Sequence, residues 1–132
     1  MSQANVGLVR AVVIAIGDCD HRLAAALFTP GAEWHNTSVF PGPQVCVGPD
    51  AIVSLWETFR DDFDVAGIEI EQIADVDGHI VAGFHQWGTG RLSGAPFDER
   101  FAAIFKVVDH RIVRVDIHGS YTKALDAVAL RE

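Results

Sequence analysis

Alternating apolar and polar positions between Ile68 and Ser120 predict four successive antiparallel strands. The third of these strands carries one apolar face: Phe97, Phe101, Ala103, Phe105 and Val107. In the fourth strand, Val113, Val115 and Ile117 alternate with polar residues. Asp77-Gly78 and Ser93-Gly94 are turn signals at two of the joints. One face of this sheet is therefore apolar and has to be covered, whereas the other can face water.

Apolar residues three and four positions apart predict three helices before the sheet, at residues 5–16, about 21–28 and 48–63. Asn5 could cap the first helix, and Asp18 or Asp20 the second, which Pro30-Gly31 would end. Residues 32–37 are expected to form a short strand, and the Pro- and Gly-rich residues 39–47 a loop or an irregular edge strand. A short helix is expected after Ser120.

This order of elements predicts an α+β fold, in which a curved antiparallel β-sheet carries the N-terminal helices on its concave face. The sheet and the third helix would enclose a pocket that is mostly apolar with a few polar groups. With 132 residues, of which 49% are hydrophobic, the chain suits one domain spanning residues 1–132.

The formal net charge of −8 argues against a nucleic-acid partner, which requires clustered Lys and Arg. No apolar run approaches the roughly 20 residues of a membrane span, so no membrane partner is expected. The first residues lack the basic start of a signal peptide, and Cys19 and Cys46 do not form a disulfide framework. We therefore expect a cytoplasmic protein.

The chain resembles the SnoaL-like family of the nuclear transport factor 2-like superfamily, whose fold is a cystatin-like cone. The resemblance covers nearly the whole chain and rests on seven short stretches in order: 5–10, 17–20, 32–35, 47–52, 88–94, 111–114 and 124–127. Together these stretches are specific for the fold. Relatives include polyketide cyclases, ketosteroid isomerases, epoxide hydrolases and binding modules without catalysis, so function has to be argued from the site.

The catalytic positions of these relatives are mostly lost. The resemblance places the water-positioning Tyr and Asn of the epoxide hydrolases on Trp34 and Asn36, and their Arg and two Asp on Phe84, Gln86 and Ile117. Only Asn36 keeps its type, and a triad without carboxylates cannot activate water in the usual way.

The catalytic groups of the ketosteroid isomerases fall on Asn36, Arg10 and Phe101. The aspartate of the polyketide cyclases falls near Ile117, and the one that often precedes the last helix is Ser120. These reactions therefore lack their usual groups as well.

Three polar residues fall on the apolar face of the sheet and are the candidate catalytic groups: Glu99, Asn36 and Gln86. A carboxylate at Glu99 would be desolvated and could act as a general acid or base, with the two amides orienting a ligand. Alternatively, Glu99 lies near the open end of its strand and reaches solvent. The expected pocket-lining residues are Trp34, Trp56, Phe59, Phe84, Phe101 and Ile117.

A reversed strand phase would instead bring Asp116 and His118 into the pocket as an acid/base pair. It would also turn Phe101 and Ile117 outward, so this is the second choice. His35, His85 and His118 share the outer phase but lack the close spacing of metal ligands, and neither a metal nor another cofactor is expected. The charged residues of the third helix, Arg60 among them, are expected on its solvated side.

Two functions from different classes follow. The first is an enzyme that uses proton transfer to isomerise, cyclise, hydrate or dehydrate a small apolar molecule. The second is a module without catalysis that binds a hydrophobic ligand or dimerises. The outer sheet face predicts a homodimer because apolar and charged residues mix on it: Val81, Trp87, Ile104, Val108 and Ile112 with Arg100, Lys106, Arg114 and Asp116.

Overall fold

The computed structural model describes residues 2–36 and 43–130. Four helices lie in these residues: α1 (Ser2–Gly17), α2 (His21–Ala26), α3 (Pro49–Asp62) and α4 (Tyr121–Leu130). Six strands accompany them: β1 (Phe28–His35), β2 (Val45–Val47), β3 (Phe63–Val76), β4 (His79–Gly90), β5 (Pro96–Val108) and β6 (Arg111–His118). The expected α+β class, with four strands in succession after the third helix, is confirmed.

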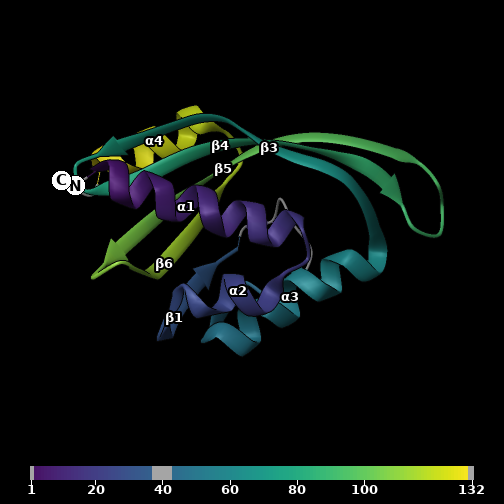
Figure 1. Cartoon of the computed structure of the whole chain (residues 1–132). Helices are drawn as coiled ribbons and strands as arrows, with labels where there is room; N and C mark the ends of the chain where they lie inside the picture. Colours follow the sequence, from purple (N-terminus) through teal and green to yellow (C-terminus); the bar gives the residue numbers. More distant parts are fainter. Residues whose placement is uncertain (1, 37–42, 131–132) are drawn as a thin grey trace.

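All six strands belong to one curved sheet in the order β2-β1-β6-β5-β4-β3 (Figure 1). Neighbouring strands are antiparallel except β1 and β6, which run parallel with Trp34 opposite Val115. This parallel pair joins the N-terminal strands to the last strand of the meander. It brings residues 81 positions apart in sequence, His35 and Asp116, into register at one part of the sheet.

The three N-terminal helices cover the concave face of the sheet, below β3, β4 and β5 in the view of Figure 1. The main hydrophobic core lies between them and the sheet, and its fully buried members include Val9, Val12, Ile52, Ile80 and Val115. Alternation along the strands places these apolar side chains on the concave face. The expected placement of the helices is therefore confirmed.

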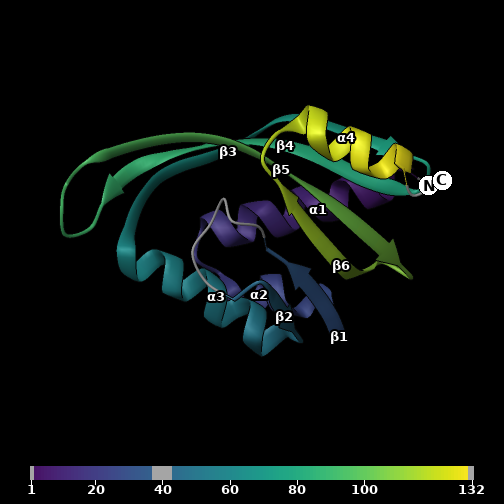
Figure 2. The same ribbon diagram turned by 180° about the vertical axis from the view of Figure 1, so that it is seen from behind.

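The last helix, α4, packs on the opposite, convex face of the sheet (Figure 2). Its Ala124 and Val128 form a second buried cluster with Val81, Ala102 and Ile104, all at most 1% exposed. The prediction that Val81 and Ile104 belong to an open outer face is therefore wrong, since the chain covers them with its own helix.

Ile112 is also misplaced by the sequence interpretation. A register shift between Lys106 and Val107 turns Ile112 to the concave side, where it is fully buried in the main core. Trp87 remains half-buried and Val108 exposed outside the α4 cluster. The homodimer stays a prediction, and only this smaller part of the proposed face is left for it.

The second helix is shorter than predicted, and the first strand is longer. α2 ends at Ala26, so Phe28 already pairs with Ile112 as the start of β1, and Pro30-Gly31 lies inside the strand. The pairing of β1 with β6 is interrupted between Phe28 and Glu33, which accommodates a proline that cannot donate to a strand ladder. Proline therefore marks an irregularity in a strand here, rather than the end of a helix.

Three further boundaries differ in detail. α1 begins at Ser2, so Asn5 lies within the helix and does not cap it, whereas Asp20 caps α2 by accepting a hydrogen bond from the Leu23 amide at 3.2 Å. β3 begins at Phe63, five residues before the predicted start of the sheet. Of the predicted loop or edge strand at 39–47, residues 45–47 form β2 and residues 39–42 lie outside the described part of the chain. Thr37, the predicted end of the short strand, also lies outside it.

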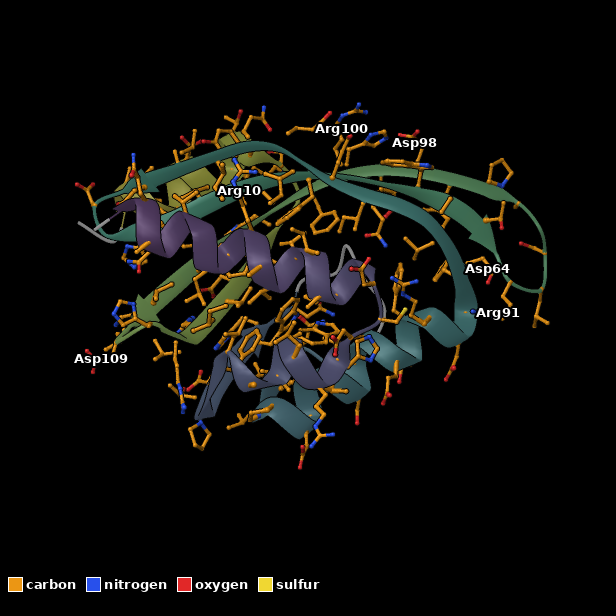
Figure 3. The ribbon with its side chains drawn as sticks, viewed as in Figure 1. Arg10, Asp64, Arg91, Asp98, Arg100 and Asp109 are labelled. Atoms are coloured by element: carbon orange, nitrogen blue, oxygen red, sulfur yellow. The ribbon has the colours of Figure 1, made fainter. Side chains whose placement is uncertain are left out.

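The far end of the β4–β5 hairpin curls toward the C-terminal end of α3 (Figure 1). Arg91 fastens it there: its amide donates to the Asp62 carbonyl at 2.9 Å, and its guanidinium pairs with Asp64 at 3.0 Å (Figure 3). A side chain on Gly88 would collide with the backbone of Asp64, next to the register shift between Val65 and Gly67. Glycine at 88 therefore permits the close approach of β3 and β4 at this bend.

Candidate functional site

A cavity of about 120 Å³ lies between the concave face of the sheet and helices α1 and α3. Its lining is mostly apolar and comes from α1, β1, α3 and β3 to β6: Val13, Ile16, Trp34, Asn36, Leu55, Trp56, Phe59, Arg60, Val65, Ile68, Phe84, Gln86, Phe101, Ala103, Phe105 and Ile117. A dry apolar cavity of about 150 Å³ holds a benzene molecule in other proteins. This cavity is somewhat smaller, which limits a guest to about one six-membered ring.

All six residues expected to line the pocket do so: Trp34, Trp56, Phe59, Phe84, Phe101 and Ile117. Phe84 and Phe101 are cross-strand partners on β4 and β5, and their rings stack with centroids 5.1 Å apart. Trp34 and Trp56 meet edge to face at 5.7 Å. Such aromatic pairs fix flat walls, because each ring limits the rotation of its partner.

Gln86 brings an amide to these walls. It is only 8% exposed, and its side chain makes no hydrogen bond within residues 2–36 and 43–130. The amide is therefore available to a polar atom of a ligand. Gln86 is the polar anchor that we consider first in this cavity.

Asn36 lies at the end of β1, is also 8% exposed and lines the same cavity. Its backbone amide donates to the Gln44 carbonyl at 2.7 Å, which holds the residue in place. The indole nitrogens of Trp34 and Trp56 are buried and have no acceptor in the described part of the chain. The structure thus brings the two predicted amides to one cavity, which the two tryptophans also line.

Glu99 does not join them. It faces Gln86 in the β4–β5 register and so has the predicted phase, but it is exposed and does not line the cavity. β6 pairs with β5 only as far as Ala102, so within residues 2–36 and 43–130 no strand pairs with β5 beside Glu99 on that edge. The desolvation that the general acid/base interpretation required is therefore absent, and the alternative of a solvated rim position holds.

Arg60 is the cavity residue that sequence reasoning missed. It was expected on the solvated side of α3, yet it is half-buried and lines the cavity. One of its terminal nitrogens, Nη2, donates to the Ile16 and Gly17 carbonyls at the end of α1, at 3.3 Å each. The available signal was its position four residues after Trp56, which places it one turn along the same helix face.

The second-choice pair, Asp116 and His118, lies outside the cavity. Asp116 faces Ile104, a member of the outer cluster, and is held by Arg114 through bonds of 2.9 and 3.0 Å. His118, two residues further along β6, is half-buried. It does not line the cavity either. The reversed strand phase is therefore wrong.

The outer face of β3 to β5 carries a group of charges around His85. Its two ring nitrogens lie 3.2 Å from Glu69 and 2.9 Å from Asp98, and Arg100 bonds Glu71 at 3.0 Å. Figure 3 shows Asp98 and Arg100 on the side of the sheet away from α1. Glu69, Glu71 and His85 have ligand atoms within 4.8 Å of one another, but each already pairs with a neighbouring side chain. The three histidines considered as metal ligands do not form this group, since only His85 belongs to it.

These carboxylates raise the pKa of His85 above its usual 6.5, chiefly through the hydrogen bond that the ring donates to Glu69 and then through Asp98, while desolvation opposes them. Because the folded state favours the protonated ring, its contribution to stability is complete below pH 6.5 and disappears as pH rises through the higher folded value. In an NMR titration, the double variant Glu69→Gln/Asp98→Asn should lower the pKa of His85. An unchanged midpoint would contradict this assignment.

Comparison with protein families decides the relationship. A family model described as the SnoaL-like domain matches residues 9–115, more than half of the chain. The chain belongs to the SnoaL-like family. The resemblance inferred from the sequence is therefore confirmed.

Solved structures share this SnoaL-like fold. One is an NTF2-like protein from Burkholderia thailandensis, with 19% identity over 97% of this chain and 98% of that one and a TM-score of 0.79. Another is a candidate polyketide cyclase from Xanthomonas campestris, with 19% identity, 96% and 98% coverage and a TM-score of 0.75. A protein with a ketosteroid isomerase-like fold from Catenulispora acidiphila, in complex with trimethylamine, has 14% identity, 86% and 85% coverage and a TM-score of 0.74. Identities this low establish the fold alone.

No curated protein matches the sequence. Within the described residues of this SnoaL-like protein, no helix is long and apolar enough to cross a membrane. Cys46 is buried, which raises the pKa of its thiol, whereas Cys19 is exposed, and both are free. The function therefore has to be argued from the cavity.

Proposed function

We propose that this SnoaL-like protein binds a small, mainly apolar molecule in its concave cavity and orients it through the amide of Gln86. The observation that carries the proposal is a cavity of about 120 Å³ with aromatic walls and one buried amide that lacks a partner in the described residues. Asn36 would assist from the end of β1. This arrangement is typical of ligand sites, in which few polar groups fix the orientation inside an apolar shell.

Binding without catalysis is favoured over proton-transfer chemistry. The described cavity lining contains amides, indoles and a guanidinium but no carboxylate or imidazole. Amides and a guanidinium do not change their protonation state near neutral pH, so they cannot act as a general base. An isomerase, cyclase or hydratase would have to use Glu99 from the rim, on substrates that extend past Gln86.

A cytoplasmic setting also stays a prediction and rests on the two free cysteines.

The matched probes toluene and benzyl alcohol test this function by ligand-observed NMR. Both should bind the wild-type protein, and Gln86→Leu should weaken benzyl alcohol by about 2- to 12-fold, as expected for one hydrogen bond of about 0.5–1.5 kcal/mol. Toluene should bind the variant at least as well, because it has no polar atom to lose.

Gln72→Leu is the matched control, since Gln72 is an exposed glutamine on β3. It should leave both probes unchanged. Absence of binding by both probes to the wild-type protein would contradict the proposed function. Equal effects of the two substitutions would contradict the role of Gln86.

A further inference from the structure

Arg60 places a positive charge in a cavity whose other side chains are uncharged. It stands in the last turn of α3, between Phe59 and the exposed acidic residues 61 and 62, and lines the cavity with Trp56 and Phe59. The chain as a whole carries a formal charge of −8, so acidic side chains outnumber basic ones. A lone cation beside aromatic walls therefore needs an explanation.

Three arginines on or near the sheet are paired, whereas the exposed Arg111 has no ion pair within the described residues. Arg91 bonds Asp64, Arg100 bonds Glu71, and Arg114 bonds Asp116. Arg60 has no acidic partner in the described residues, although it is more buried than Arg91 and Arg100. The charge of Arg60 is balanced only in part, by the two backbone carbonyls that it contacts at the end of α1.

The position of Arg60 is fixed by contacts at both of its ends. Nη2 donates to the Ile16 and Gly17 carbonyls, and the backbone carbonyl of Arg60 accepts a bond from the Arg91 Nε at 3.1 Å. A guanidinium has five N–H donors, and the groups on Nε and Nη1 make no hydrogen bond with the described residues. The side chain is therefore held in place with donors left over, as an anion site requires.

The cavity limits which anion can use these donors. About 120 Å³ leaves room for one six-membered ring, and the stacked Phe84 and Phe101 offer flat apolar contact. A single guanidinium balances one negative charge, and the acidic protein disfavours multiply charged ligands such as phosphates. A planar carboxylate matches a guanidinium through two parallel hydrogen bonds.

We propose that the cavity takes a small aromatic or alicyclic monocarboxylate, whose carboxylate pairs with Arg60 and whose ring lies between α3 and the Phe84–Phe101 pair. This inference rests on the proposed function, because it names the ligand class of the same cavity. Arg60 would set specificity for acids over neutral rings, while Gln86 would contact a second polar atom.

Benzoate and benzamide test the inference, since they have nearly the same shape and differ in charge. By NMR titration at neutral pH and low salt, the wild-type protein should bind benzoate at least 10-fold more tightly than benzamide. Arg60→Gln should weaken benzoate by about 10- to 100-fold, as expected for charge-assisted hydrogen bonds. Benzamide should change by less than 3-fold.

Arg22→Gln is the matched control, because Arg22 is an exposed arginine on α2. It should leave benzoate binding unchanged. Arg60→Lys should restore only part of the affinity, since a lysine keeps the charge but loses the planar fork. Benzyl alcohol reports on folding of the Arg60 variants, since it needs the cavity but no cation.

The outcomes separate the two proposals. If benzyl alcohol binds but benzoate binds no better than benzamide, the carboxylate inference is wrong and the proposed function stands. If Arg60→Gln weakens benzoate and benzamide equally, the charge recognition is also refuted. If no probe binds the wild-type protein, the proposed function itself fails.

Discussion

Replacing Trp56 by alanine is expected to destabilise the protein by about 3–5 kcal/mol, the usual cost of a large-to-small change in a core. Trp56 is 7% exposed, and its ring lies 5.7 Å from His21, 5.9 Å from Phe28 and 5.7 Å from Trp34. It therefore joins α2, α3 and β1 at one point. Urea denaturation, monitored by far-UV circular dichroism, measures the decrease in the free energy of unfolding.

Trp87→Ala serves as the control for Trp56→Ala. Trp87 is half-buried on the outer face, where its ring packs on His85 at 4.7 Å and over Gly67. The substitution removes the same atoms from a more exposed position. The decrease in the free energy of unfolding should therefore be clearly smaller than for Trp56→Ala. A Trp87→Ala loss equal to that of Trp56→Ala would contradict the assignment of Trp56 to the core.

Replacing Val128 by aspartate should detach α4 from the sheet. Val128 is 1% exposed against Val81 and Ile104, so the change removes apolar burial and places a carboxylate where it has no partner in the described structure. The expected loss is about 3 kcal/mol or more, from burial of about 1.5–3 kcal/mol and the added cost of the charge. Uncovering the outer cluster should also increase self-association, which sedimentation velocity measures.

Ala129→Asp is the matched control on the same helix. Ala129 is the neighbouring residue but is exposed, so the substitution should change stability by no more than about 0.5 kcal/mol. If the two aspartates have the same effect, α4 does not cover the sheet in solution as the structure shows. This pair therefore tests directly which part of the outer face is open for a partner.

Strand phase could be predicted from the sequence because it depends on local alternation. Phe84, Phe101 and Ile117 alternate with polar neighbours on three strands, and only one phase buries all of them. The reversed phase would have exposed these large side chains. The same argument placed Gln86 and Asn36 correctly, since each shares the phase of an aromatic neighbour.

Depth along a strand could not be predicted in this way. Glu99 and Phe101 share a face and are two residues apart, yet Phe101 is 8% exposed and Glu99 is open to solvent. The difference depends on where β6 ends against β5, and this is a property of strand pairing. The alternation of apolar and polar residues places both side chains on the same face. It therefore cannot show that one is buried and the other exposed.

The sequence by itself determined the fold class, the order of the elements and, apart from Ile112, which strand side chains face the helices, because each depends on repeats within one strand or helix. Only the tertiary structure decided that α4 covers Val81 and Ile104, that Asp116 is held by Arg114, and that Arg60 turns toward the cavity. These outcomes depend on contacts between segments far apart in the chain. A charge is exposed or enclosed according to what packs over it, and in this protein the end of α1 packs over Arg60.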